Sequence, residues 1–96
     1  MNPVFEYDPD KSRKNSERHG IDFEQAQSLW RVPHGFFHAR TVLGEDRYII
    51  LGKLENQVYM AIFTYRESVV RLISCHRADM KWQRQYERRS HETQEN

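Results

Sequence analysis

The side chains best suited to chemistry gather around the last apolar segment of the chain. They are Arg66, Arg71, His76, Arg77 and Tyr86. Arginine presents a planar fork of donors that fits phosphate oxygens, and histidine exchanges a proton near neutral pH. RNA cleavage without a metal needs these types, because one group must take the 2′-hydroxyl proton, cations must stabilise the charge on phosphorus, and an acid must protonate the leaving oxygen. A charged sheet edge or a partner-binding surface explains the same residues at least as well.

Metal binding and cysteine chemistry explain the sequence less well. The histidines are scattered, and only His34 and His38 are four residues apart, in a segment that a proline and a glycine keep out of a helix. No cluster of cysteines or carboxylates completes a ligand set, so we expect neither a metal nor another cofactor. Cys75 and His76 are neighbours in an expected strand and should point to opposite faces, which argues against a nucleophile pair.

Length and composition limit the classes of protein. The 96 residues have the size of one domain, and the formal net charge of +1 does not by itself indicate a polyanionic partner. The longest apolar-rich stretch, residues 59–63, is far shorter than the roughly 20 residues of a membrane helix, so we expect no membrane role. A single cysteine and the lack of a signal-peptide pattern favour the reducing cytoplasm.

Two N-terminal helices are expected to come first. Asp8 and Pro9 are typical of a helix start and Gly20 of its end, which predicts a helix over residues 9–19 with hardly an apolar side chain. This helix is better explained as a solvated connector than as a nucleic-acid contact. A second helix begins at Asp22 in a capping box. Its apolar face comprises Phe23, Ala26, Leu29 and Trp30.

An antiparallel sheet of three to four strands and a C-terminal helix complete an α+β fold. Strand signals occur at residues 47–54, 57–65 and 69–75, with a weaker one at 36–41. The strands expected at 47–54, 57–65 and 69–75 are joined by links that are short enough only for hairpins. The helical spacing returns over residues 78–89, with Ala78, Trp82 and Tyr86 on its apolar face. We therefore expect one domain over residues 1–89 and a polar flexible tail over 90–96.

Further basic side chains on these elements are candidates for RNA binding. They are Lys11, Arg18, His19, Lys53, Lys81 and Arg84. On the last helix the basic row is either a solvated face or a stripe that faces phosphate. In a regular strand Arg71 and His76 point to opposite faces, so they converge only if the strand ends or bulges near Cys75.

An ordered set of motifs runs along nearly the whole chain, apart from residues 33–46 and the tail. Its first part is Phe5-Glu6-Tyr7-Asp8-Pro9-Asp10-Lys11, Asn15, Arg18-His19-Gly20-Ile21-Asp22-Phe23-Glu24 and Ala26. Its second part is Arg47-Tyr48-Ile49, Leu51-Gly52, Thr64, Arg66, Val70-Arg71-Leu72-Ile73-Ser74, Arg77-Ala78 and Tyr86-Glu87. The set resembles the BrnT toxin family.

The resemblance implies a bacterial type II toxin with a RelE-like fold, a metal-independent ribonuclease that inhibits translation. It also implies a BrnA-like antitoxin as partner, with operator DNA bound only through that antitoxin. Where the family usually has glutamate, arginine and glutamate, this chain has Tyr65, His76 and Trp82. Two alternatives therefore stay open: a catalytically weakened homologue that acts mainly by binding antitoxin and regulating its operon, and a nucleic-acid-binding regulator without catalysis.

Overall fold

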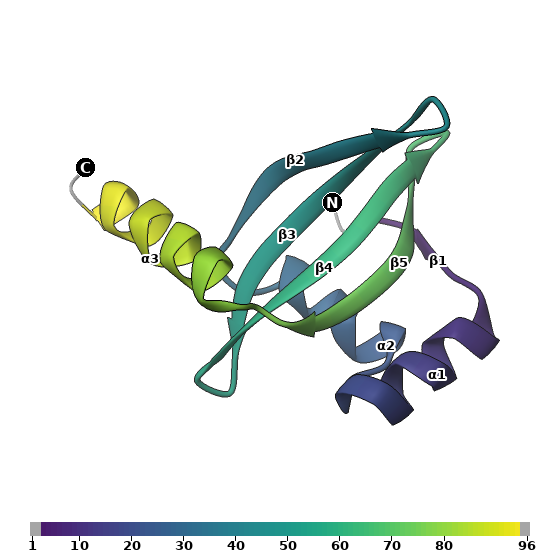
Figure 1. Cartoon of the computed structure of the whole chain (residues 1–96), viewed down its shortest axis with the longest axis horizontal. Coiled ribbons are helices and arrows are strands. Elements are labelled where there is room, and N and C mark those ends of the chain that lie inside the picture. Colours follow the sequence, from purple (N-terminus) through teal and green to yellow (C-terminus); the bar gives the residue numbers. More distant parts are fainter. Residues whose placement is uncertain (1–2, 95–96) are drawn as a thin grey trace.

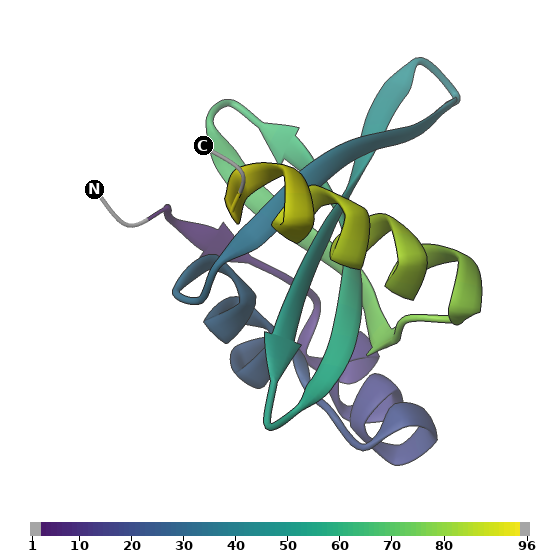
Figure 2. The same ribbon diagram turned by 90° about the vertical axis from the view of Figure 1, so that its left-hand side faces the viewer.

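The computed structural model describes residues 3–94, with side chains over residues 3–90. The elements are β1 (Phe5–Glu6), α1 (Pro9–His19), α2 (Phe23–Ala26), the 3₁₀ helix η1 (Gln27–Trp30), β2 (His34–Val42), β3 (Glu45–Leu54), β4 (Gln57–Arg66), β5 (Val69–Arg77) and α3 (Met80–Gln94). Helices α1 and α2 lie on one side of the twisted sheet and α3 lies on the other (Figures 1 and 2). The α+β class is confirmed.

The sheet differs from the predicted one in its size and in its first strand. It has five strands in the order β1-β5-β4-β3-β2, and it is mixed because β1 runs parallel to β5 while the others are antiparallel. The expectation of three to four antiparallel strands after two leading helices is therefore wrong. Strand β1 is only two residues long and pairs Phe5 with Val70 and Glu6 with Arg71. A strand this short has no readable alternation, and its pairing is long-range.

The remaining strands form a meander joined by tight turns, as predicted for the last three. Each turn has positive φ angles at both central residues, Leu43-Gly44, Glu55-Asn56 and Glu67-Ser68. This is the backbone of two-residue hairpins, whose twist matches that of the flanking strands. The weak signal over residues 36–41 is a full strand of nine residues, β2.

The first core lies between the sheet and the short helices α2 and η1. The capping box is present: the Gln25 N–H donates to Asp22 Oδ1 at 2.7 Å, and the Asp22 N–H donates to Gln25 Oε1 at 2.9 Å. Helix α2, which it starts, buries Phe23 against the sheet, and η1 buries Leu29 there. We call this side of the sheet the α1–α2 face, and it carries Ile50, Ala61, Phe63, Val70, Leu72 and Cys75.

Helix α1 is fastened to the sheet by polar side chains. Ser12 and Asn15 are buried, and Ser12 Oγ accepts the N–H of Phe23 at 2.9 Å. Asn15 Nδ2 donates to the carbonyls of Ile21 at 2.8 Å and Cys75 at 2.7 Å, while Asn15 Oδ1 accepts the Cys75 N–H at 3.3 Å. The interpretation of this helix as a solvated connector is wrong. Its docking surface is polar because it caps the free edge of β5.

The second core lies on the opposite side of the sheet, which we call the α3 face. Trp82 and Tyr86 of α3 pack there against residues that include Phe37, Leu51 and Met60. The rings of Phe37 and Trp82 are 5.5 Å apart, edge to face. Helix α3 continues to Gln94, so residues 90–94 of the predicted tail are helical, and residues 95–96 lie outside the described residues.

None of the helices described over residues 3–94 is long and apolar enough to cross a membrane.

Candidate functional site

Strand β5 carries a bulge that decides which of its side chains share a face. Ile62 of β4 pairs with Ser74, but the next residue, Phe63, pairs with Leu72. Ile73 is therefore the extra residue of a β-bulge, which shifts the alternation of the residues around it. The sequence signal for β5 shows no break at this point.

The bulge brings Arg71, Ser74 and His76 to one face. Their partners on β4 are the alternate residues Thr64, Ile62 and Met60. Alternate residues of a strand share a face, and Met60 and Ile62 belong to the core under α3, so this is the α3 face. Arg71 and His76 are still about 13 Å apart along the strand, at about 3.3 Å for each of the paired positions that separate them.

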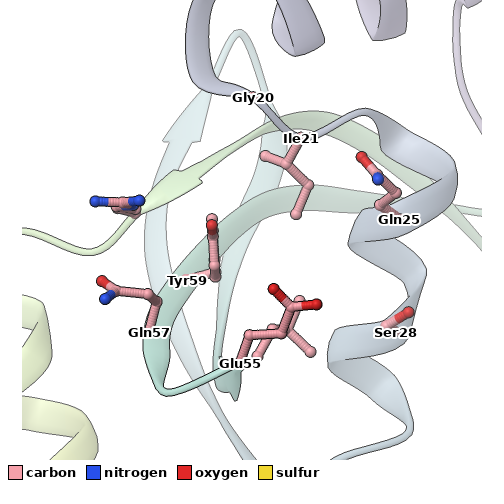
Figure 3. A pocket seen from close by; sticks show the side chains of 9 residues that line it. Gly20, Ile21, Gln25, Ser28, Glu55, Gln57 and Tyr59 are labelled. Atoms are coloured by element: carbon pink, nitrogen blue, oxygen red, sulfur yellow. The ribbon is translucent and has the colours of Figure 1, made fainter.

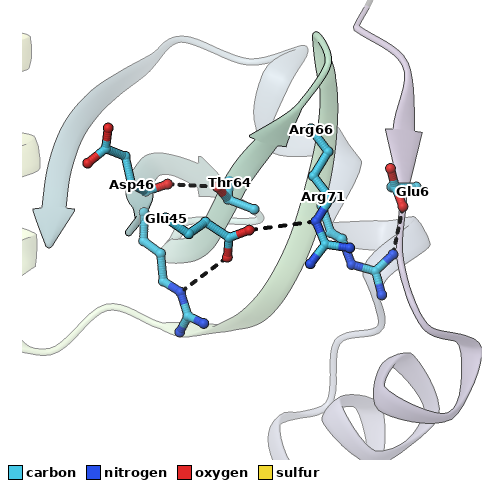
Figure 4. A network of polar contacts seen from close by, with 7 residues as sticks. Glu6, Glu45, Asp46, Thr64, Arg66 and Arg71 are labelled. Carbon is cyan, nitrogen blue, oxygen red and sulfur yellow. Dashed lines mark hydrogen bonds and ion pairs between the residues drawn. The ribbon is translucent and has the colours of Figure 1, made fainter. Parts of the chain in front are cut away.

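The arginines at the β4–β5 hairpin lie in a network with carboxylates (Figure 4). Arg71 Nη1 is 2.7 Å from Glu6 Oε2, and Arg66 Nε is 3.6 Å from Glu45 Oε2. Arg47 Nε is 3.9 Å from the other oxygen of Glu45, and this buried nitrogen has no hydrogen-bond partner within the described part of the chain. Arg66 and Arg71 thus share one end of the sheet, but their charges are largely matched by carboxylates.

At the other end of β5, His76 lies beside the last residue of α1, His19. The two ring centroids are 5.4 Å apart and the ring planes are inclined by 41°. His76 Nδ1 lies 2.8 Å from the carbonyl oxygen of Arg77 and donates to it, which leaves Nε2 as the acceptor in the neutral ring. The pKa of His19 is lowered from its ordinary value by desolvation, then by the neighbouring His76 and Arg18 charges.

A groove of about 240 Å³ runs between α1 and β5 next to these histidines. It is lined by Lys11, Lys14, Asn15, Arg18, His19, Ile73 and Ser74. Three of the predicted RNA-binding residues, Lys11, Arg18 and His19, are therefore together. The sequence reasoning missed Lys14 and Ser74 as site residues. Lys11, Lys14 and Arg18 are spaced so that they lie on one helix face. This spacing is the sequence signal from which Lys14 could have been predicted as a site residue.

A second pocket, of about 540 Å³, opens beside the C-terminal end of α1 (Figure 3). It is lined by Gly20, Ile21, Gln25, Ser28, Leu54, Glu55, Gln57, Tyr59 and Arg77. Gly20 of the pocket directly follows His19 of the groove at the C-terminal end of α1. Arg77 pairs with Tyr59 and thus lies on the α1–α2 face, not on the face that carries Arg71.

The other predicted site residues lie elsewhere. Lys53 is exposed near the end of β3, and Lys81 and Arg84 are exposed on α3. The Lys81 ammonium is 5.7 Å from the centre of the Trp82 ring. Tyr86 packs into the second core. The structure thus separates the candidates into a hairpin arginine cluster, a histidine groove and scattered residues on β3 and α3.

Cys75 faces the first core and is fully buried, on the side of β5 opposite to His76. Desolvation raises the pKa of its thiol to about 12, so it is not a thiolate nucleophile near neutral pH. Over the described residues, no group of three or more His, Cys, Asp or Glu side chains is positioned to hold a metal ion.

Comparison with known proteins identifies the family. Residues 7–81 match the family model described as the ribonuclease toxin BrnT of type II toxin-antitoxin systems. No curated protein matches the chain. The matched segment covers more than half of the chain and contains the groove, the histidine pair and the hairpin arginines. The chain therefore belongs to the BrnT family of ribonuclease toxins of type II toxin-antitoxin systems.

Proposed function

We propose that this BrnT protein cleaves RNA without a metal, that the cleavage inhibits translation, and that a BrnA-like antitoxin neutralises it. The observation that carries the proposal is the contact of His76 with His19, which lines a groove together with basic side chains. A histidine with an available Nε2 transfers protons near neutral pH, and lysine and arginine side chains hold phosphate. Together they supply acid–base and electrostatic catalysis.

The hairpin arginines have a supporting role in this proposal. Arg66 and Arg71 lie near the β4–β5 hairpin, at the far end of β5 from His76, and are paired with Glu45 and Glu6. Arg71 is about 13 Å from His76 along the sheet and Arg66 is farther still, so both are too distant to touch the same phosphate. They contact a phosphate further along the RNA. Arg77 lies on the α1–α2 face at the end of β5, and its long side chain reaches the reacting phosphate from that face.

Two of the departures from the family pattern lie outside the groove. Tyr65 packs its ring 5.5 Å from Phe63, on the α1–α2 face, and Trp82 packs on Phe37. Neither replacement removes a group from the groove, so these positions do not favour a catalytically weakened homologue.

An antitoxin surface is proposed at the aromatic residues of the α1–α2 face. Phe36 is 43% exposed and Tyr65 is 50% exposed, large fractions for aromatic side chains. Tyr48 and Phe63 lie beside them, with ring centroids 5.5–6.0 Å from Phe36 or Tyr65. Exposed aromatics near arginines are typical of protein interfaces. An acidic antitoxin segment that folds over these aromatics and continues across the sheet to the groove between α1 and β5 would hide the RNA site. Operator DNA would be bound only through the antitoxin.

Induced expression without an antitoxin tests the function. We expect bacterial growth to stop, and the variants His76→Ala and Arg77→Ala to relieve the arrest, since loss of one transition-state contact costs about 10²-fold or more in rate. His38→Ala, on β2, is the matched histidine control and should still arrest growth. Normal growth while soluble, folded wild-type protein accumulates would contradict the proposal.

A further inference from the structure

We infer that the groove between α1 and β5 holds the scissile phosphodiester of single-stranded RNA, with His19 and His76 as its two proton-transfer groups. The inference rests on the proposed ribonuclease function and assigns its reacting centre. It adds His19 as a second catalytic residue and places the reaction away from the hairpin arginines.

The distance between the histidines fits one phosphodiester. With ring centroids 5.4 Å apart, both rings reach oxygens of a single phosphodiester through hydrogen bonds of about 2.6–3.2 Å. The 2′-oxygen bonds to phosphorus as the bond from phosphorus to the 5′-oxygen breaks. His19 takes the 2′-hydroxyl proton and His76 gives its proton to the departing 5′-oxygen. The products are a 2′,3′-cyclic phosphate and a 5′-hydroxyl end.

The assignment of base and acid follows from the surroundings of each ring. His19 lies beside Arg18 and His76, and the lowered pKa of His19 favours the neutral form that accepts a proton. His76 donates from Nδ1 to the carbonyl of Arg77, a bond that the protonated ring retains while Nε2–H donates to the leaving oxygen.

The charge of the groove distinguishes it from the arginine cluster. Lys11, Lys14 and Arg18 line it together with neutral residues, and its described lining contains no carboxylate. At the hairpin, by contrast, Glu6 and Glu45 already occupy the guanidiniums. A phosphate enters the groove without displacing a carboxylate, so the groove is the better phosphate site.

The adjoining pocket explains why the substrate is single-stranded. An unstacked base next to the scissile phosphate fits against the Tyr59 ring, where Gln25, Ser28 and Gln57 offer hydrogen bonds to base edges (Figure 3). A base in a duplex is paired and stacked and cannot enter. Arg77 also lines this pocket, and from there its guanidinium reaches the phosphate.

Kinetics of matched histidine variants test the pair. In EDTA, His19→Gln and His76→Gln should each slow cleavage of single-stranded RNA by about 10²–10⁴-fold, while His38→Gln keeps the wild-type rate. The wild-type rate should rise and then fall with pH, and His19→Gln should lose the rising limb, which reports the base. Arg18 is the other charged group that acts on His19, and Arg18 remains in both variants, as do Lys11, Lys14 and Arg77. Thermal melting confirms that each variant is folded.

Measurements of RNA binding test the groove independently of the ribonuclease proposal. The probe is an RNA that carries 2′-deoxyribose at the cleavage position. Lys14→Gln should weaken its binding and lower the salt slope by about 0.7, whereas Arg13→Gln should not, because Arg13 lies outside the groove and pairs with Glu17 at 3.0 Å.

Each outcome decides one claim. If the wild type cleaves RNA and His19→Gln is as active as His38→Gln, the histidine pair is refuted and the ribonuclease proposal stands. Absence of wild-type cleavage, with weaker RNA binding by Lys14→Gln than by Arg13→Gln, would refute the ribonuclease proposal and the histidine pair but support the groove as an RNA site. Equal binding by the two variants would overturn the groove.

Discussion

Replacing Asn15 by alanine removes the contact that fastens α1 to the sheet. The side chain donates to two carbonyls, at 2.8 Å from Ile21 and 2.7 Å from Cys75, and accepts one N–H from Cys75 at 3.3 Å. Asn15 is only 8% exposed and Cys75 is fully buried, so these backbone groups lose their partner without gaining water. A buried polar group left unsatisfied costs about 1–3 kcal/mol.

The two short bonds dominate this cost, and we expect Asn15→Ala to lower the free energy of unfolding by about 2–4 kcal/mol. That is a large part of the roughly 5–15 kcal/mol that stabilises a small domain. The melting temperature should fall by roughly 10–30 °C, at about 4–8 °C per kcal/mol for a domain of this length. Asn15→Asp keeps the acceptor but loses both donors, so it should be at least as destabilising.

Urea and thermal unfolding followed by circular dichroism measure the effect. Arg13→Ala is the matched control on the same helix. It loses only exposed ion pairs with Glu17 and Asp10, each worth about 0.3–0.5 kcal/mol, and should melt close to the wild type. An Asn15→Ala protein within about 0.5 kcal/mol of the wild type would refute the claim that these hydrogen bonds hold α1.

Two further predictions concern the first core. Gly52→Ala should destabilise the fold by about 1–3 kcal/mol in a thermal melt, because a Cβ there would meet Leu29 Cδ2 at 3.0 Å and Val32 Cγ2 at 3.2 Å. An unchanged melting temperature would contradict this close packing. Cys75 should resist iodoacetamide in the native protein near neutral pH, because burial raises its pKa to about 12, and it should react on unfolding. Rapid labelling of folded protein would contradict its burial.

Local signals in the sequence identified the helices and hairpins. Asp8 caps the start of α1 with a 2.9 Å bond from the Asp10 N–H, and Gly20 ends the helix with φ of 74°. The capping box at Asp22 is equally local. Such features depend on residues a few positions apart, so they are readable in one chain without knowledge of the fold.

Features that depend on distant contacts were not predictable. Strand β1 exists because Phe5 and Glu6 pair with β5, and Asn15 is buried because it bonds to Cys75. The bulge at Ile73 arises from the register of β4 against β5, which leaves the apolar pattern of the strand intact. These contacts are set by tertiary packing, on which local propensity has little influence.

The candidate site follows the same division. Residue chemistry alone identified His19 and His76, but only the fold brings the end of α1 to the end of β5 and places the two rings together. It also separates Arg71 from Arg77, which the sequence suggested as partners. The residue types of the site can thus be predicted from the sequence, but their arrangement in space cannot.

The most direct test of the central claim is incubation of the purified chain with a 5′-labelled single-stranded RNA in EDTA, followed by analysis of the fragment ends. Metal-independent cleavage through two proton-transfer groups predicts fragments with 2′,3′-cyclic phosphate and 5′-hydroxyl ends, and their loss when the antitoxin is added first. RNA that stays intact beside folded protein, or cleavage that begins only when a divalent cation is restored, would contradict the claim.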